Sequence, residues 1–278
     1  MPDPLSIAAS IVGIAVPALH GTRLLLDDLE KLSDAPETIK NLKGEVRLVE
    51  AAINSFLTIP EAQWQVLGTS MVDQSKTTLT TCQKSCEKFK ADLAGWTRHS
   101  GDGKLVLRDR AHIVFNKKQI KAMSVEVHGD QVSLNLVASM ATLHYSILNA
   151  RITQDIKASI SEKAAEIAGT ISSTELQLAT VNTELDRLHL GVNASHTSNG
   201  GSDQGAEQSI LGQERAALES CLRLLEALKL KNEEGKEHAA QKERDQSINA
   251  TFGQNNHGLQ QVVNHGSFSN LSFGGPRS

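Results

Sequence analysis

Apolar side chains recur along most of this chain at the three- and four-residue spacing of an amphipathic α-helix. Residues 39–56 show this spacing most clearly, because each apolar position there follows the last by three or four residues. Such a seam puts its apolar side chains on one face of a helix, and that face needs a partner to bury it. The seam consists of Ile39, Leu42, Val46, Val49, Ile53 and Phe56.

Further seams occupy residues 79–96 and 132–147, and Cys82 and Cys86 lie within the first of them. A free cysteine in such a seam behaves as a small hydrophobe, so both thiols are predicted to lie in the core. Several helices that each need a partner indicate an all-α fold. We therefore predict an antiparallel helical bundle over residues 1–150.

The first 19 residues are the most apolar stretch of the chain, and they allow two interpretations. They form either a core helix of the bundle, which is the predicted resting state, or a membrane-seeking segment that the bundle stores. Asp3 and no Lys or Arg precede the apolar run, unlike a secretory signal, and the run is shorter than the roughly 20 residues that span a bilayer. The residues that would enter lipid are Leu5, Ile7, Ile11, Val12 and Ile14.

The chain beyond residue 150 divides by composition into four segments. Residues 151–190 have sparse apolar positions and predict a long helix that projects from the bundle and pairs with another chain. Residues 191–205, GVNASHTSNGGSDQG, have the composition of a flexible linker. Residues 206–245 predict an amphipathic, highly charged helix, and residues 246–278 form a Gly- and Asn-rich tail.

The tail contains an internal repeat, because Asn256-His257-Gly258 recurs as Asn264-His265-Gly266. The tail is either a disordered terminus or a set of short β-prone pieces that stack as an amyloid-like assembly. The candidate self-assembly residues are Phe252, Gly253, Asn256, Gly258, Gln260, Asn264, Gly266 and Phe273.

A second local feature is a run of basic residues between positions 98 and 121. It is either a solvated helical face or a contact surface for anionic membrane lipid, which would make the protein a peripheral membrane protein. The basic residues are Arg98, Lys104, Arg108, Arg110, Lys117, Lys118 and Lys121, opposed only by Asp102 and Asp109.

Composition and motifs narrow the function. The net charge of −4 gives no reason to expect nucleic-acid binding, and three cysteines without CxxC spacing indicate a reducing, cytoplasmic location. The sequence contains no HExxH pair, no GxSxG elbow and no GxxxxGK[ST] phosphate loop. We therefore predict a non-enzymatic protein without a cofactor, a metal site or catalytic residues.

Three stretches carry a family resemblance: DPLSIAASIVGIAVPA, LLLDDLEKLSDAPETIKNLKGEVRLVEAAI and TTLTTCQKSCEKFKADL. Over residues 1–150 the chain resembles the fungal N-terminal domain of STAND (NLR-like) proteins, also described as HeLo-like and as the N-terminal domain of azaphilone pigment biosynthesis cluster protein L. The resemblance implies an all-helical domain without enzymatic activity. It also implies a role at membranes in programmed cell death, triggered by a C-terminal amyloid motif. The tail is similar to those motifs, except that Gln261 stands where their commoner form has Gly.

Two functions follow as expectations. The first is a signalling or interaction protein whose tail self-associates, giving a homo-oligomer or binding a STAND-type partner. The alternative is an accessory or regulatory protein encoded in an azaphilone pigment (polyketide) biosynthesis cluster, with no catalytic activity of its own.

Overall fold

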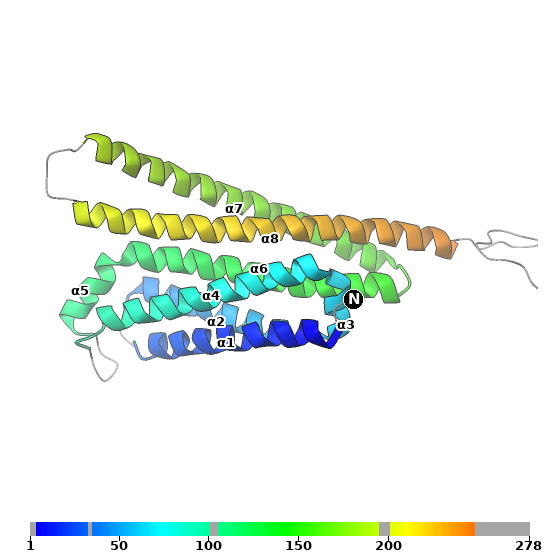
Figure 1. The fold of residues 1–278 in the computed structure, drawn as a ribbon, viewed down its shortest axis with the longest axis horizontal. Coiled ribbons are helices and arrows are strands. Elements are labelled where there is room, and N and C mark those ends of the chain that lie inside the picture. Colours follow the sequence, from blue (N-terminus) through cyan, green and yellow to red (C-terminus); the bar gives the residue numbers. More distant parts are fainter. Residues whose placement is uncertain (1–3, 33–34, 101–104, 195–200, 248–278) are drawn as a thin grey trace, which may run out of the picture.

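The computed structural model describes residues 4–32, 35–100, 105–194 and 201–247. Within these ranges the chain forms eight α-helices and no strand, so the all-α prediction is confirmed. The helices are α1 (Pro4–Glu30), α2 (Glu37–Leu57), α3 (Glu61–Leu67), α4 (Thr69–Trp96), α5 (Leu107–Phe115), α6 (Lys117–Asn149), α7 (Gln154–Ala194) and α8 (Gly201–Ser247) (Figure 1).

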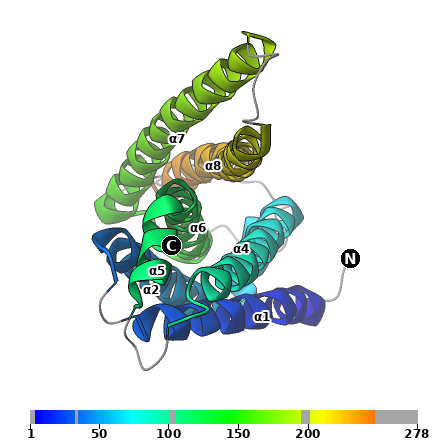
Figure 2. The same ribbon diagram turned by 90° about the vertical axis from the view of Figure 1, so that its left-hand side faces the viewer.

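Helices α1 to α6 form the bundle predicted for the first half of the chain. The long helices α1, α2, α4 and α6 pack side by side, with α2 against α6 and α1 against α4, while α3 and α5 lie at opposite ends (Figures 1 and 2). The seam of α2 is buried throughout, as its spacing predicted. Near the α3 end, the rings of Phe56 and Trp64 pack edge to face with centroids 4.8 Å apart.

Helix α1 lies at the edge of this bundle and is buried along one face only. Ile11, Ala15 and Ala18 are at most 1% exposed, whereas Val12 and Val16 are 43% and 50% exposed. Its partners α2, α3 and α4 all contact that buried face (Figure 2). A sequence that is apolar all round suits a helix surrounded by others, so the outward apolar stripe of α1 is a feature that the seam pattern did not predict.

Helices α7 and α8 form a hairpin in which α8 packs along the bundle and α7 crosses it (Figure 1). The first part of α7 contacts α6 and adds Ile160 and Ile167 to the main core, whereas its C-terminal part contacts α8 away from the bundle. The long helix that we predicted to project toward another chain therefore packs along α8 of its own chain. The segment predicted as a linker over residues 191–205 is partly helical, because α7 continues to Ala194 and α8 begins at Gly201. A separate apolar cluster ties the two helices together and consists of Val181, Leu185, Leu211 and Leu218.

Candidate functional site

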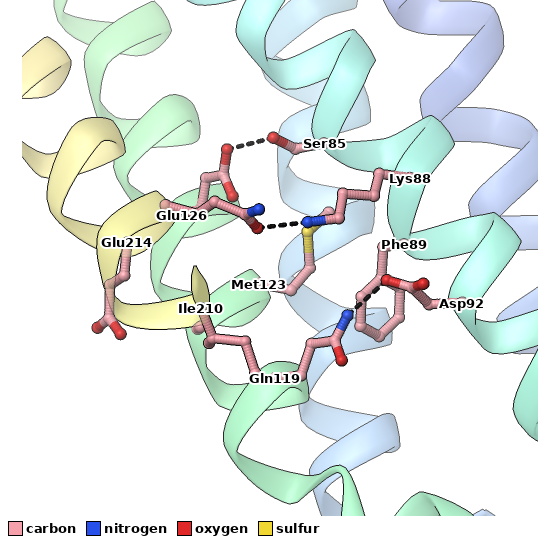
Figure 3. A pocket seen from close by; sticks show the side chains of 11 residues that line it. Ser85, Lys88, Phe89, Asp92, Gln119, Met123, Glu126, Ile210 and Glu214 are labelled. Atoms are coloured by element: carbon pink, nitrogen blue, oxygen red, sulfur yellow. Dashed lines mark hydrogen bonds between the residues drawn. The ribbon is translucent and has the colours of Figure 1, made fainter. Parts of the chain in front are cut away.

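The candidate site is the interface at which α8 crosses α4 and α6 (Figure 3). A cavity of about 50 Å³ opens there between the three helices. Its lining combines carboxylates, amides, a lysine and a few apolar side chains, so it has polar groups that could recognise a partner. The lining residues are Ser85, Lys88, Phe89 and Asp92 of α4, Gln119, Ala122, Met123 and Glu126 of α6, and Ile210, Gln213 and Glu214 of α8.

The polar side chains of this cavity bond to one another across the helices. Lys88 Nζ of α4 donates to Gln213 Oε1 of α8 over 2.5 Å. The Ser85 hydroxyl of α4 donates to Glu126 of α6, and the Gln119 amide of α6 donates to Asp92 of α4 (Figure 3). The first of these bonds is exposed and the other two are partly buried, and each joins two helices. The polar groups of the cavity therefore serve a helix–helix contact.

Two of the carboxylates are held in an unfavourable environment. Burial raises the pKa of Glu126, although the Ser85 hydroxyl and Lys88 partly offset the rise. Burial also raises the pKa of Glu214, and Lys121 opposes that shift. A raised carboxyl pKa means that the folded state disfavours the charged form, so both groups weaken the interface when they are ionised.

Asp130 follows Glu126 by one turn of α6, and all three cysteines of the chain surround it. Its Oδ2 atom is buried without a hydrogen-bond partner among the described residues, and burial raises its pKa well above the usual range. A hydrogen bond to Cys86 and burial raise the pKa of the Cys82 thiol, and burial raises that of Cys221. The hydrogen bond with Cys82 lowers the pKa of the Cys86 thiol, and burial opposes that shift. A raised pKa leaves the Cys82 and Cys221 thiols protonated at neutral pH, which fits core packing rather than thiolate chemistry.

Cys82 and Cys86 belong to α4 and Cys221 to α8, and two of these thiols have neighbouring hydroxyl groups. Cys86 Sγ of α4 lies 3.8 Å from Thr22 Oγ1 of α1, and Cys221 Sγ of α8 lies 3.2 Å from Ser133 Oγ of α6. Within the part of the chain that the structure describes, no three His, Cys, Asp or Glu side chains are grouped so as to hold a metal ion.

A second contact fixes α8 further along α6, where Gly235 lies against His144. A Cβ atom on Gly235 would lie 2.9 Å from His144 Nε2 and 3.1 Å from Ile147 Cδ1, so only glycine permits this approach without a shift. His144 is 4% exposed, and its Nε2 atom has no partner among the described residues. Burial, with the positive charges of Lys231 and His238 nearby, lowers its pKa to about 4.

Helix α8 also completes the C-terminal end of α6. Lys242 Nζ donates to the carbonyl oxygens of Ile147 and Leu148 over 2.9 and 2.7 Å. These carbonyls belong to the last turn of α6, where helical carbonyls lack partners and attract positive charge. The described part of α8 is thus anchored to the bundle by polar contacts at both the cavity and its distal half.

The residues predicted to enter lipid are all in α1 and occupy different environments. Ile11 is buried, Ile7 and Ile14 are partly buried against the core, and Val12 is exposed. Leu5 belongs to the first turn of α1, and its side chain lies outside the described residues. Among the described helices, α1 alone is long and apolar enough to cross a membrane, over Ile7–Glu30 with a mean hydropathy of 1.5. Both a core helix and a membrane segment meet that criterion.

The predicted self-assembly residues, Phe252 to Phe273, lie outside the described residues. The basic run divides between the turn that follows α4, helix α5 and the start of α6, and Lys104 lies outside the described part. Sequence reasoning missed the roles of Glu126, Asp130 and Gly235. The four-residue spacing of Glu126 and Asp130 beside an apolar seam was a usable signal, but which helix covers them depends on contacts distant in the chain.

The fold and the interface define this protein as an all-α helical bundle with a C-terminal helical hairpin folded onto it. A family model described as pigment biosynthesis cluster protein PigL N-terminal matches residues 2–226. The chain belongs to that family, in agreement with the resemblance noted in the sequence. The matched region covers α1 to α7 and ends within α8. No curated protein and no solved structure matched the chain.

Proposed function

We propose that this protein is a non-enzymatic interaction protein in which α8 transmits association of the tail to the helical bundle. The observation that carries the proposal is the position of α8. This helix packs along α4 and α6, and the chain continues from its last residue, Ser247, directly into the tail. A force or constraint on the tail therefore acts first on the helix that covers the bundle.

The chemistry of the interface supports a mechanism in which association of the tail releases α8 from the bundle. The side chains of Glu126, Asp130 and Glu214 are partly buried at or beside the contact, and that burial raises the pKa values of their carboxyl groups. Ionised acids in such positions reduce the free energy that holds α8 in place. The hairpin also has its own apolar cluster, which includes Val181 and Leu211, so α7 and α8 can stay together when they leave the bundle.

The test compares the full chain with a chain that ends at Ser247. The full chain should form ordered assemblies that bind thioflavin and appear as filaments by electron microscopy, and the shortened chain should remain dispersed. A third chain with the residues of the tail in scrambled order controls for length and composition. Equal assembly by the shortened and full chains would remove the tail from the proposal.

The family match favours a second candidate function, because its description names a pigment biosynthesis cluster. In that case the protein is an accessory or regulatory component that supports pigment production without a catalytic step of its own. Deleting the gene and quantifying pigment by chromatography tests this candidate. Unchanged pigment, together with neighbouring genes that encode a STAND receptor, would favour signalling instead.

A further inference from the structure

Helix α5 lies at one end of the bundle (Figures 1 and 2). Its outward face is apolar and exposed to solvent. Leu107 is 83% exposed, Phe115 is 75% exposed and Val114 is 61% exposed. Single exposed apolar side chains are ordinary, but three large ones on a nine-residue helix form a patch. A patch of this kind marks a surface for interaction.

The opposite face of α5 is fixed to the bundle, so the apolar face has a defined outward direction. The buried carboxylate of Asp109 accepts hydrogen bonds from the His99 backbone N–H over 2.9 Å and from the Ser100 hydroxyl over 2.6 Å. Ile113, four residues later on the same face, is completely buried. At 3.6 residues per turn, positions 107, 111, 114 and 115 then lie on the far side of the helix.

Basic side chains flank this apolar face on both sides. Arg108 and Arg110 are exposed, and neither forms an ion pair with a residue that the structure describes. Lys117 and Lys121, at the start of α6, are exposed at the same end. Of the two acidic residues that oppose these charges in the sequence, Asp109 is buried and Asp102 lies outside the described residues. The described part of the outward surface is therefore apolar and positive, in a chain whose net charge is −4.

We propose that this end of the bundle is a contact surface for an anionic lipid bilayer. Helix α5 lies in the headgroup region, with Leu107, Val114 and Phe115 inserted toward the acyl chains and Arg108 and Arg110 against the lipid phosphates. A helix with Phe and Leu on one face and Arg or Lys beside it is suited to this interfacial position. Each basic residue near an anionic surface adds on the order of a fivefold factor to binding.

The location of α5 fits a bilayer as the occupant. It lies at one end of the long axis of the molecule, while the C-terminal end of α8 lies at the other (Figure 1). The first turns of α8 reach the same end as α5, where Lys118 of α6 bonds to Glu207 of α8, so a flat surface there meets α5 beside the start of α8 (Figure 1). Ser247, at the other end of α8, lies far from that surface. The surface is separate from the function proposed for α8, because none of its α5 residues lines the cavity beneath α8. Of its basic residues, Lys121 of α6 lies near Glu214 of α8, so the tests below change only α5.

Liposome flotation of the full chain tests the surface, since flotation separates bound protein from sedimenting assemblies. The protein should float with vesicles of phosphatidylserine and phosphatidylcholine and remain unbound with phosphatidylcholine alone. Leu107→Ser with Phe115→Ser should reduce binding more than tenfold. Arg108→Gln with Arg110→Gln should reduce it about 25-fold, the product of the two charge factors.

Matched controls come from other exposed positions. Leu176→Ser on α7 removes a side chain that is 71% exposed, and Val12→Ser with Val16→Ser removes the outward stripe of α1. Both control variants should bind vesicles like the parent. The control variants and the α5 variants should all give the helical circular dichroism spectrum of the parent. Three results would overturn the proposal: equal binding to neutral vesicles, undiminished binding of the α5 variants, or an α5-dependent dimer that ignores vesicles.

Discussion

At the scale of single residues, the interface of α8 contains polar groups that a purely apolar contact would not need. His144 is the clearest example, because it is buried beside Lys231 and His238 with only Glu234 of opposite charge nearby. It is neutral in the folded state at physiological pH. Buried groups of this type make stability depend on pH, and the direction follows from the pKa in each state.

The His144 ring should make folding less favourable as the pH falls. Its pKa is about 4 in the folded protein against an ordinary value of 6.5, so below pH 6.5 the unfolded chain binds a proton that the folded protein excludes. The loss grows until about pH 4 and reaches about 3 kcal/mol, the equivalent of that difference in pKa. Urea unfolding of the parent and of His144→Gln between pH 7 and pH 4 measures it.

The comparison with His144→Gln is needed because other buried groups act in the opposite direction. Glu126 and Asp130 have raised pKa values, so their ionised forms destabilise the fold at neutral pH and that penalty disappears on acidification. The difference in unfolding free energy between the parent and His144→Gln at each pH therefore gives the contribution of the histidine alone. Parallel pH profiles for the parent and the variant would show that His144 does not titrate as its burial requires.

At the scale of elements, the sequence predicted where most helices lie but less about which surfaces they bury. The apolar seam of α2 predicted its buried face correctly, because apolar residues spaced three and four apart all lie on one side of a helix. The one-sided burial of α1 was not predictable in the same way, since its sequence is apolar on every side. The short helices α3 and α5 depend on their packing against neighbours, which local spacing does not encode.

The close approach of α8 to α6 should depend on the absence of a side chain at Gly235. Gly235→Ala places a Cβ atom 2.9 Å from His144 Nε2, and the resulting overpacking should cost about 1–3 kcal/mol of unfolding free energy. Gly212→Ala on the same helix is the matched control, because a Cβ atom there would meet nothing within 4 Å. The control should gain up to about 1 kcal/mol from helix propensity alone.

Urea unfolding at pH 7 gives the change in unfolding free energy for each glycine variant. Hydrogen exchange of the α8 amides shows where in the structure that change occurs. Faster exchange in α8 of Gly235→Ala, with unchanged exchange in α2, would place the effect at the interface. If both alanine variants were equally stabilised, the two helices would not approach each other closely at Gly235.

At the scale of the whole molecule, the chain is a bundle covered by its own C-terminal hairpin. The sequence predicted the helices of the hairpin but assigned α7 to a partner chain, because a polar helix with sparse apolar positions needs a partner and the pattern does not identify it. The partner is α8. The candidate site depended on the same long-range pairing, which explains why Glu126, Asp130 and Gly235 were not recognised as a group.

The three cysteines give a direct measurement of whether α8 leaves the bundle on assembly. Cys82 and Cys86 are at most 1% exposed inside the bundle, whereas Cys221 of α8 lies at the interface beside Ser133 of α6. Alkylation by iodoacetamide, followed by mass spectrometry, reports the reactivity of each thiol separately. We expect Cys221 to react slowly in the dispersed full chain and much faster after assembly, with Cys82 and Cys86 slow throughout. Slow alkylation of Cys221 in both states would contradict transmission through α8.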